Sequence, residues 1–442
     1  MGSEMTPNLS FDVEWSPSEH GPAEIRQTSA FFQLCVGRNV ATRAEDVWSQ
    51  SVHNRVRLSL YPLAVWLASS WWRLRWEPAP YSGVSSMTWR MAHELAAAGD
   101  GSLWPRLTFA CDGETVETKC EASNPLSNEP VRYLASFSAT LGASEFERSI
   151  DDFLNLVLAR LDAVGVAEQV LRDLWREVAE ERRDEDLATL RKFEAQLGFE
   201  TDEAPEDLIQ RLSAVSQNQG AEAAEEIAPA CAGDDPAQTL RRIFEFAQSS
   251  GTAGRIELPR SLSAALRSAA NEPVEPWKRG HFLAGEARRA WGLGGDPIPD
   301  SKIEELLQVP INTITGERSS VVRLPMGLAI RRDGSDNLNL LFRKRNRPGV
   351  RFEAARFIVS HLLASQQERW LPATDAKTAR QKVQRAFAAE FLCPFDALED
   401  FLQGDFSPEA IEEAGTRFGV SDLAVKSHLA NHGKTPFDAV VA

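Results

Sequence analysis

Residues 356–365 read Arg-Phe-Ile-Val-Ser-His-Leu-Leu-Ala-Ser and have the spacing of a helix built to hold a zinc ion. An H-E-x-x-H helix places two histidines on one face to bind Zn²⁺, and the glutamate between them acts as general base for the bound water. Here His361 holds the first ligand position, Leu362 the base position and Ser365 the second ligand position. Because leucine cannot accept a proton and serine is a poor Zn²⁺ ligand, we expect a helix that no longer supports hydrolysis.

The segments around this helix resemble the ImmA/IrrE family, zinc-peptidase-like proteins that cleave or bind repressors in bacteria and their mobile elements. The matching text is, in chain order, Ala-Arg-Arg-Ala-Trp-Gly-Leu at 287–293, Pro-Ile-Pro-Asp at 297–300, Ile-Glu-Glu-Leu-Leu at 303–307, the strand-like Leu-Asn-Leu-Leu-Phe at 338–342, the helix at 356–361 and Arg-Phe-Gly-Val-Ser at 417–421. The resemblance implies a zincin-like α+β domain over residues 278–400, followed by a closing helical hairpin over 405–435.

The resemblance also implies a third-ligand helix at residues 381–394. Its end, Phe-Ala-Ala-Glu-Phe-Leu-Cys-Pro, closely matches the family text E-x-x-A-N-x-F-A-A-E-L-L-x-P. Carried over by position, the metal-binding glutamate of the family falls on Gln381. With Leu362 and Ser365, this leaves three of the four positions needed for hydrolysis changed. The implied site is degenerate, with His361 as its remnant, and we expect no catalytic residue, no bound metal and no other cofactor.

Zinc held by substitute ligands is the alternative for this part of the chain. Glu390 and Cys393 can bind metal, but they lie past the position from which the family reaches its zinc. His428 and His432 stand four apart in a predicted helix, and without a third ligand nearby in sequence we interpret them as a pair on the helix surface. His93 belongs to a second incomplete H-E-x-x-H match, and we expect a structural role for it.

Composition restricts the classes of protein to which the chain can belong. Its 442 residues suffice for two to four domains, and a hydrophobic content of 43% with a charged content of 25% is that of a soluble globular protein. Residues 1–5 lack a signal segment and no run of eighteen apolar residues occurs, so we expect a cytoplasmic protein without membrane association. The net charge of -16 favours protein partners over nucleic acid, and five cysteines without metal-type spacing predict free thiols.

Residues 1–140 are predicted to form a β-rich domain. Period-two alternation at 55–60 and at 107–118, with Asp112-Gly113 as the turn, indicates strands and a hairpin. Eight of the twelve tryptophans lie in this part, several beside arginines in residues 66–76. Such interleaving is compatible with stacking on single-stranded nucleic acid or with a protein interface, but we favour an alternating strand with tryptophans in the core and arginines outward.

Residues 144–270 are predicted to form a helical connector domain. Apolar residues recur every three or four positions over 146–161, 170–178 and 187–197. Residues 201–236 carry nine acidic side chains against one arginine, which predicts a solvated or mobile acidic segment. Pro273 and Pro276 mark the start of the peptidase-like domain.

One local group of basic residues could form a binding patch beside the site helix. It consists of Arg343, Lys344, Arg345, Arg347 and Arg351. At the mouth of the degenerate cleft it could receive an acidic peptide or a nucleic-acid phosphate, and a solvated loop is the equal alternative.

The leading hypothesis is a non-catalytic ImmA/IrrE-like regulatory protein with an α+β fold. It would bind a protein partner, such as a repressor, a toxin or a defence component, in the control of mobile elements, phage response or stress. Two alternatives are a divergent metallopeptidase that uses zinc to cleave one dedicated partner and a nucleic-acid-responsive sensor that uses the basic group.

Overall fold

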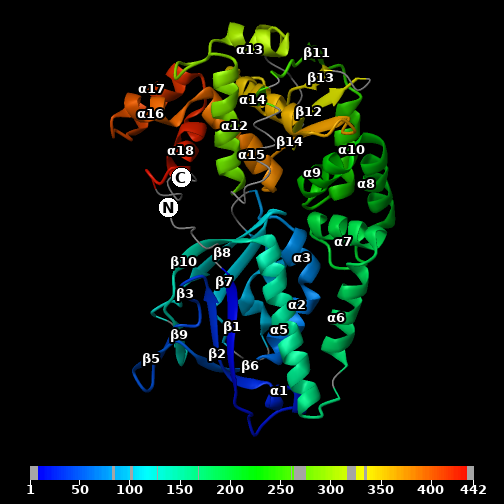
Figure 1. The fold of residues 1–442 in the computed structure, drawn as a ribbon, viewed down its shortest axis with the longest axis vertical. Helices are drawn as coiled ribbons and strands as arrows, with labels where there is room; N and C mark the ends of the chain where they lie inside the picture. The colour runs from blue at the N-terminus through cyan, green and yellow to red at the C-terminus, as the bar shows by residue number, and fades with distance from the viewer. Residues whose placement is uncertain are drawn as a thin grey trace. The chain divides into compact units, whose positions relative to one another are not determined.

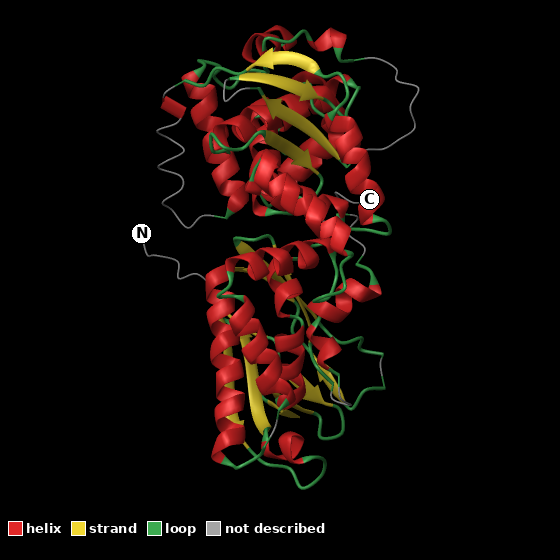
Figure 2. Ribbon diagram, turned by 90° about the vertical axis from the view of Figure 1, so that its right-hand side faces the viewer, coloured by secondary structure: helices red, strands yellow, loops and turns green. Residues whose placement is uncertain are grey.

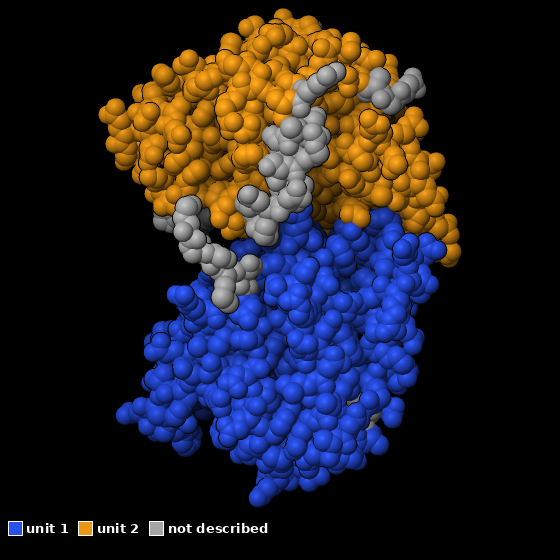
Figure 3. Space-filling view, in the orientation of Figure 1, with its two compact units in different colours: residues 1–205 blue, residues 206–442 orange. Residues whose placement is uncertain are grey.

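The computed structural model describes residues 8–81, 85–99, 103–126, 128–167, 169–259, 261–262, 275–315, 325–332 and 336–435. The chain divides into two compact units, residues 1–205 and 206–442, which Figure 3 colours separately. Helices and sheets occur in both, so the fold is α+β (Figures 1 and 2). The division differs from the expected domains, because the predicted connector is split between the units. The described part leaves out residues 1–5, residues 263–270 of the predicted connector, and Pro273.

Three antiparallel sheets form the β part of the first unit. The strands are β1 (Leu9–Trp15), β2 (Ser29–Val36), β3 (Asn39–Val40) and β6 (Val56–Ser59) in one sheet, β7 (Arg106–Cys111), β8 (Thr115–Glu121) and β10 (Phe137–Gly142) in another, and β4 (Ala44–Asp46), β5 (Ser51–His53) and β9 (Val131–Tyr133) in the third. Cys111 pairs with Val116 across the β7–β8 hairpin, which confirms the predicted turn at Asp112-Gly113.

The tryptophan-rich segment is helical, so the prediction of an alternating strand is wrong. Helices α2 (Tyr61–Ser69) and α3 (Trp71–Trp76) follow β6 directly. Trp71 is buried as expected, but Arg73 is also only 2% exposed, because its guanidinium pairs with Glu77 and Glu200. Short helices α1 (Ala23–Gln27), α4 (Met87–His93) and η1 (Leu95–Ala98) complete this part of the unit.

Three helices assigned to the connector belong to the core of the first unit. They are α5 (Ala143–Ala163), α6 (Val170–Glu181) and α7 (Glu185–Leu197), and their apolar faces have the predicted spacing. On α5, Phe153 stacks on Phe11 with ring centroids 4.4 Å apart, and Phe146 lies 5.3 Å from Phe109. The sheets therefore need α5 to bury their apolar faces, and the unit does not end at residue 140.

The acidic segment forms two helices and is not a mobile loop. Helices α8 (Glu206–Gln219) and α9 (Ala221–Cys231) begin the second unit, followed by α10 (Pro236–Ala247). The Glu368 carboxylate accepts hydrogen bonds from the first backbone N–H groups of α9, those of Glu222 and Ala223. Only glycine fits at Gly220 before this helix, because a Cβ there would lie 1.9 Å from a Glu368 oxygen. The alanine-rich sequence that looked unstructured is a good helix former once its ends are satisfied.

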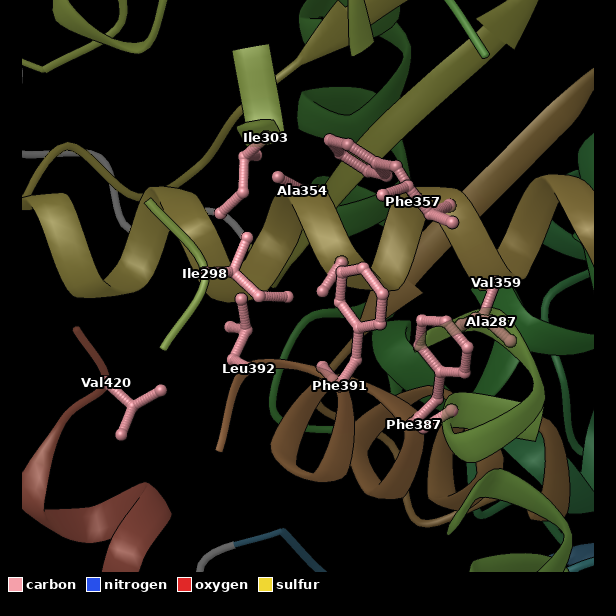
Figure 4. Close-up of a cluster of buried hydrophobic side chains, with 14 of the residues drawn as sticks. Ala287, Ile298, Ile303, Ala354, Phe357, Val359, Phe387, Phe391, Leu392 and Val420 are labelled. Atoms are coloured by element: carbon pink, nitrogen blue, oxygen red, sulfur yellow. The ribbon is translucent and has the colours of Figure 1, made fainter. Parts of the chain in front are cut away.

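A four-stranded antiparallel sheet organises the second unit. Its order is β11 (Thr252–Arg255), β13 (Asn337–Leu341), β12 (Met326–Arg331) and β14 (Trp370–Thr374), and β13 confirms the strand predicted at 338–342. Helices α14 (Arg347–Leu363) and α15 (Ala379–Leu392) pack on each other and on this sheet. Phe387 and Phe391 of α15 point toward α14, whereas Phe357 projects from the other side of α14, toward Gly327 of β12 (Figure 4).

Further helices in the described part of the second unit pack around this core. They are α12 (Pro276–Ala290), α13 (Asp300–Leu307), η2 (Ile311–Thr313), α16 (Phe395–Leu402), α17 (Pro408–Phe418) and α18 (Asp422–Asn431). A Cβ added at Gly280 of α12 would lie 2.6 Å from the Val383 carbonyl oxygen, so α12 and α15 meet backbone to backbone. Gly419, at φ 67°, ends α17 and makes the turn of the predicted closing hairpin.

Two expectations about the whole chain can be compared with this structure. All five cysteines are free thiols, as predicted. Within the described ranges, no helix combines the length and the apolar character needed to cross a bilayer.

Candidate functional site

The helix that carries His361 ends before the second ligand position. Helix α14 finishes at Leu363 with Ala364 as its C-cap, so Ser365 lies outside the helix and is exposed. Leu362, in the base position, is buried in the hydrophobic core at 6% exposure. Positions 361 and 365 therefore do not share a helical face, which a two-ligand helix requires.

Both ring nitrogens of His361 have charged neighbours. The Arg331 guanidinium, from β12, places Nε and Nη2 each 3.3 Å from His361 Nδ1, and Nε2 lies 3.5 Å from an Asp336 carboxylate oxygen. Burial, and next the positive charge of Arg331, lower the pKa of His361 below its ordinary 6.5. A neutral imidazole that accepts hydrogen bonds from a guanidinium has its Nδ1 lone pair already occupied.

Gln381 joins α15 to its neighbours. Its side-chain oxygen accepts hydrogen bonds from Arg356 and, at 2.9 Å, from the Thr374 N–H, and its Nε2 donates to the Pro372 carbonyl at 3.2 Å. Burial lowers the pKa of Arg356 to about 9, so this arginine still carries its charge at neutral pH. In the described part of the chain, His361 belongs to no group of three or more His, Cys, Asp or Glu side chains that could hold a metal ion.

The basic group does not form an exposed patch, because several of its side chains bind carboxylates or backbone carbonyls within the unit. Arg351 is 1% exposed and donates to the carbonyls of Gly419, at 3.0 Å, and Ile298, at 2.7 Å. Its guanidinium also pairs with Asp300, which accepts a second hydrogen bond from Arg347 at 2.6 Å. The expectation that Arg351 is available to a ligand is therefore wrong.

Arg343 is also committed to partners within the unit. Its side chain is 12% exposed and pairs with Glu353 at 3.2 Å and with Asp375 at 2.5 Å. Arg345 donates to a backbone carbonyl at 3.0 Å, whereas Lys344 is exposed. The predicted patch is thus reduced to Lys344 and the partly paired Arg347, which makes this surface a weak site for phosphate.

The structure brings together a different set of side chains that suit a metal ion. His281 of α12, Glu390 of α15, His428 of α18 and His432, which caps α18, offer one ligand atom each, all within 4.8 Å of one another. The interpretation of His428 and His432 as a surface pair is wrong for His428, which is 1% exposed. Sequence reasoning missed His281 entirely, and Glu390 faces this group instead of supplementing His361.

Aromatic rings enclose the three imidazoles of this group. The Phe395 ring stacks on His432 with centroids 3.5 Å apart, and the Trp277 ring lies 5.3 Å from His281. The Phe395 N–H donates to Glu390 at 3.1 Å.

His281, His432 and Glu390 have the protonation states that metal ligands need. Burial lowers the pKa of His281 to about 4 and also lowers that of His432. Burial alone would raise the pKa of Glu390, but its contact with His428 and the hydrogen bond from the Phe395 N–H lower it instead. At neutral pH these two imidazoles are neutral and Glu390 is ionised.

His93, the other histidine considered from sequence, lies in the first unit and is fully buried. Its Nδ1 lies 2.9 Å from the Phe109 carbonyl and its Nε2 lies 3.0 Å from Glu77. These contacts support the structural role expected for it.

Comparison of the chain with protein families, curated proteins and solved structures finds no match.

Proposed function

We propose that the protein is a non-catalytic regulator whose second unit is an ImmA/IrrE-like domain of zincin-like fold that binds a protein partner without cutting it. One observation carries this proposal: an arginine contacts each of two side chains at the positions that the resemblance assigns to ligands. The Arg331 guanidinium lies against His361, and the Arg356 guanidinium donates to Gln381. Guanidinium groups stay protonated at neutral pH, so a Zn²⁺ ion in this cleft would sit beside fixed positive charge. Leu362, where the base should be, cannot activate water.

A protein partner is favoured by an exposed aromatic residue in the first unit. Trp48, between β4 and β5, is 87% exposed, and Val52 of β5 is 52% exposed. The Trp48 N–H donates to Asp46 at 2.9 Å, which fixes the turn that presents the indole ring. Tryptophan is enriched in interface hot spots. The net charge of -16 opposes a nucleic-acid partner.

The biological role follows from the resemblance of the second unit. The partner would be a repressor, a toxin or a defence component, and the setting the control of mobile elements, phage response or stress. Candidates are the products of neighbouring genes, purified and mixed with the whole chain in the presence of Zn²⁺ or of a chelator. A stable complex with an intact partner is expected in both conditions, and His361→Ala should bind equally well. Chelator-sensitive cleavage that His361→Ala abolishes would overturn the proposal in favour of the divergent metallopeptidase.

The contribution of the hairpin is tested with a matched pair of variants. Trp48→Ala should weaken the complex by about 2 kcal/mol or more if Trp48 is a hot spot. Met87→Ala is the control, because Met87 is also exposed, at 68%, in the same unit but on helix α4. Equal binding of both variants would exclude the hairpin and would leave the proposal of a non-catalytic cleft standing.

A further inference from the structure

We infer that His281, Glu390, His428 and His432 form a site for one divalent transition-metal ion of the zinc type, which clamps the C-terminal hairpin onto the rest of the second unit. The site uses neither the three positions that the resemblance assigns to metal ligands, His361, Ser365 and Gln381, nor the base position at Leu362. It therefore does not rest on the proposed function, and either can fail without the other.

The four side chains come from helices that are fixed against one another. Gly280, next to His281, brings α12 into backbone contact with α15, where Val383 and Ala386 leave no room for a side chain. Helix α18 packs on α15 and buries Val425 and Leu429 in the same hydrophobic core. Because His428 and His432 are four residues apart, they project from one side of α18. Ligands held on packed helices keep the geometry that a metal ion needs.

Four of the six imidazole nitrogens in this group have no hydrogen-bond partner. His281 Nε2, both ring nitrogens of His428 and His432 Nε2 are buried without a hydrogen-bond partner. His428 Nε2 lies 3.1 Å from a Glu390 oxygen, yet the pair does not meet the geometry of a hydrogen bond. Buried polar atoms normally find a partner, and several unsatisfied nitrogens converging on one carboxylate indicate an absent common partner. A cation supplies that partner for one nitrogen of each imidazole.

The donor set selects the class of ion. Three imidazole nitrogens and one carboxylate oxygen suit zinc and its neighbours among the first-row metals, and they do not suit calcium or magnesium, which prefer oxygen. With bonds of about 2.0–2.2 Å, a tetrahedral site needs ligand atoms about 3.4 Å apart. The largest separation here is at most 4.8 Å, so small side-chain rotations would close the site.

The role of the ion follows from the number of ligands. Four protein ligands complete a tetrahedron and leave no open position for water or substrate, which is the arrangement of a structural zinc site. The Phe395 N–H on Glu390 and the aromatic walls of Trp277 and Phe395 would orient the ligands and limit the entry of water. An ion here ties α18 to α12 and α15.

The test measures metal content of the whole chain and its histidine variants. The purified protein is stripped with a chelator, dialysed against Zn²⁺ and then against metal-free buffer, and the retained metal is counted. We expect one ion in the wild type and in His361→Gln, and none in His428→Gln or His432→Gln. His361 is the matched control because it is a buried histidine of the same unit. Co²⁺ in place of Zn²⁺ should give the visible absorption of tetrahedral coordination in the first two proteins only.

A second measurement on the wild type guards against variants that fail to fold. Zn²⁺ should slow amide hydrogen exchange in α18 of the stripped wild type, and chelator should reverse the effect. The inference is overturned if the wild type retains no ion, if His428→Gln retains as much as the wild type, or if α18 exchanges equally fast with and without Zn²⁺. Loss of the ion from His361→Gln alone would overturn both this inference and the proposal of a metal-free cleft.

Discussion

The Arg331 guanidinium lies against His361, with two of its nitrogens 3.3 Å from Nδ1 of the imidazole. This contact opposes the binding of Zn²⁺ at His361, because the positive charge of the guanidinium lies beside the imidazole. Arg331 also donates to the His361 carbonyl at 3.0 Å, so it ties strand β12 to the end of α14. His361 is thus part of the attachment between sheet and helix.

The stability of the second unit should fall in mild acid because of His361. Burial and Arg331 lower the pKa of His361, and they outweigh Asp336, which acts in the opposite direction. The unfolded chain therefore binds a proton that the folded chain does not, and the free energy of unfolding falls as the pH drops below about 6.5. His361→Gln should flatten this acid slope in urea titrations at a series of pH values. His53→Gln, at an exposed site, serves as control, and an equal slope in all three proteins would contradict the prediction.

Gln381→Ala should destabilise the second unit by about 1–3 kcal/mol, because the buried Arg356 guanidinium and the Thr374 N–H would each lose one acceptor. Gln381→Glu keeps an acceptor facing Arg356 and should cost less, although it introduces a carboxylate where the ImmA/IrrE resemblance implies the third ligand. Urea midpoints measure the loss of stability in both variants. The metal content of Gln381→Glu shows whether the new carboxylate binds zinc. A new zinc ion in Gln381→Glu that depends on His361 would show that the cleft is closer to activity than we propose.

Gly280→Ala should destabilise the unit by about 1–3 kcal/mol through overpacking, because its methyl group would lie 2.6 Å from the Val383 carbonyl oxygen. Gly285→Ala is the control on the same helix, since nothing lies within 4 Å of a Cβ there. It should be neutral or stabilise by up to about 1 kcal/mol, as alanine favours the helix. Thermal unfolding measures the stability of both variants. Equal midpoints for the two would exclude close α12–α15 packing.

The sequence predicted correctly those elements that local interactions determine. The hairpin at Asp112-Gly113 depends on one turn, and the helices after residue 143 depend on a regular apolar spacing. The tryptophan-rich segment was assigned wrongly because a short apolar run does not distinguish strand from helix by its period. The acidic segment was assigned wrongly because its helices are stabilised by tertiary contacts, such as the Glu368 carboxylate at the start of α9.

The candidate metal site lay beyond sequence reasoning for a related reason. His281 and His428 are joined only when α12 and α18 both pack on α15, and no local pattern records that contact. The spacing of His428 and His432 was the only signal, and an i, i+4 pair is common on helix surfaces. Conversely, Arg351 looked like part of a basic surface because a sequence does not reveal that several carbonyls converge on its guanidinium.

Arg351→Ala and Arg347→Ala should differ sharply, although both arginines pair with Asp300. Arg351 is buried, and its loss would leave the carbonyls of Gly419 and Ile298 without their donor, at a cost of about 3–5 kcal/mol. The Arg347 side chain is 54% exposed, so its loss should cost less than about 1 kcal/mol, and less still at high salt. Because Gly419 is the turn between α17 and α18, Arg351→Ala should also speed hydrogen exchange in that hairpin. Similar urea midpoints for the two variants would mean that Arg351 is solvated and available to a ligand, as the sequence had suggested.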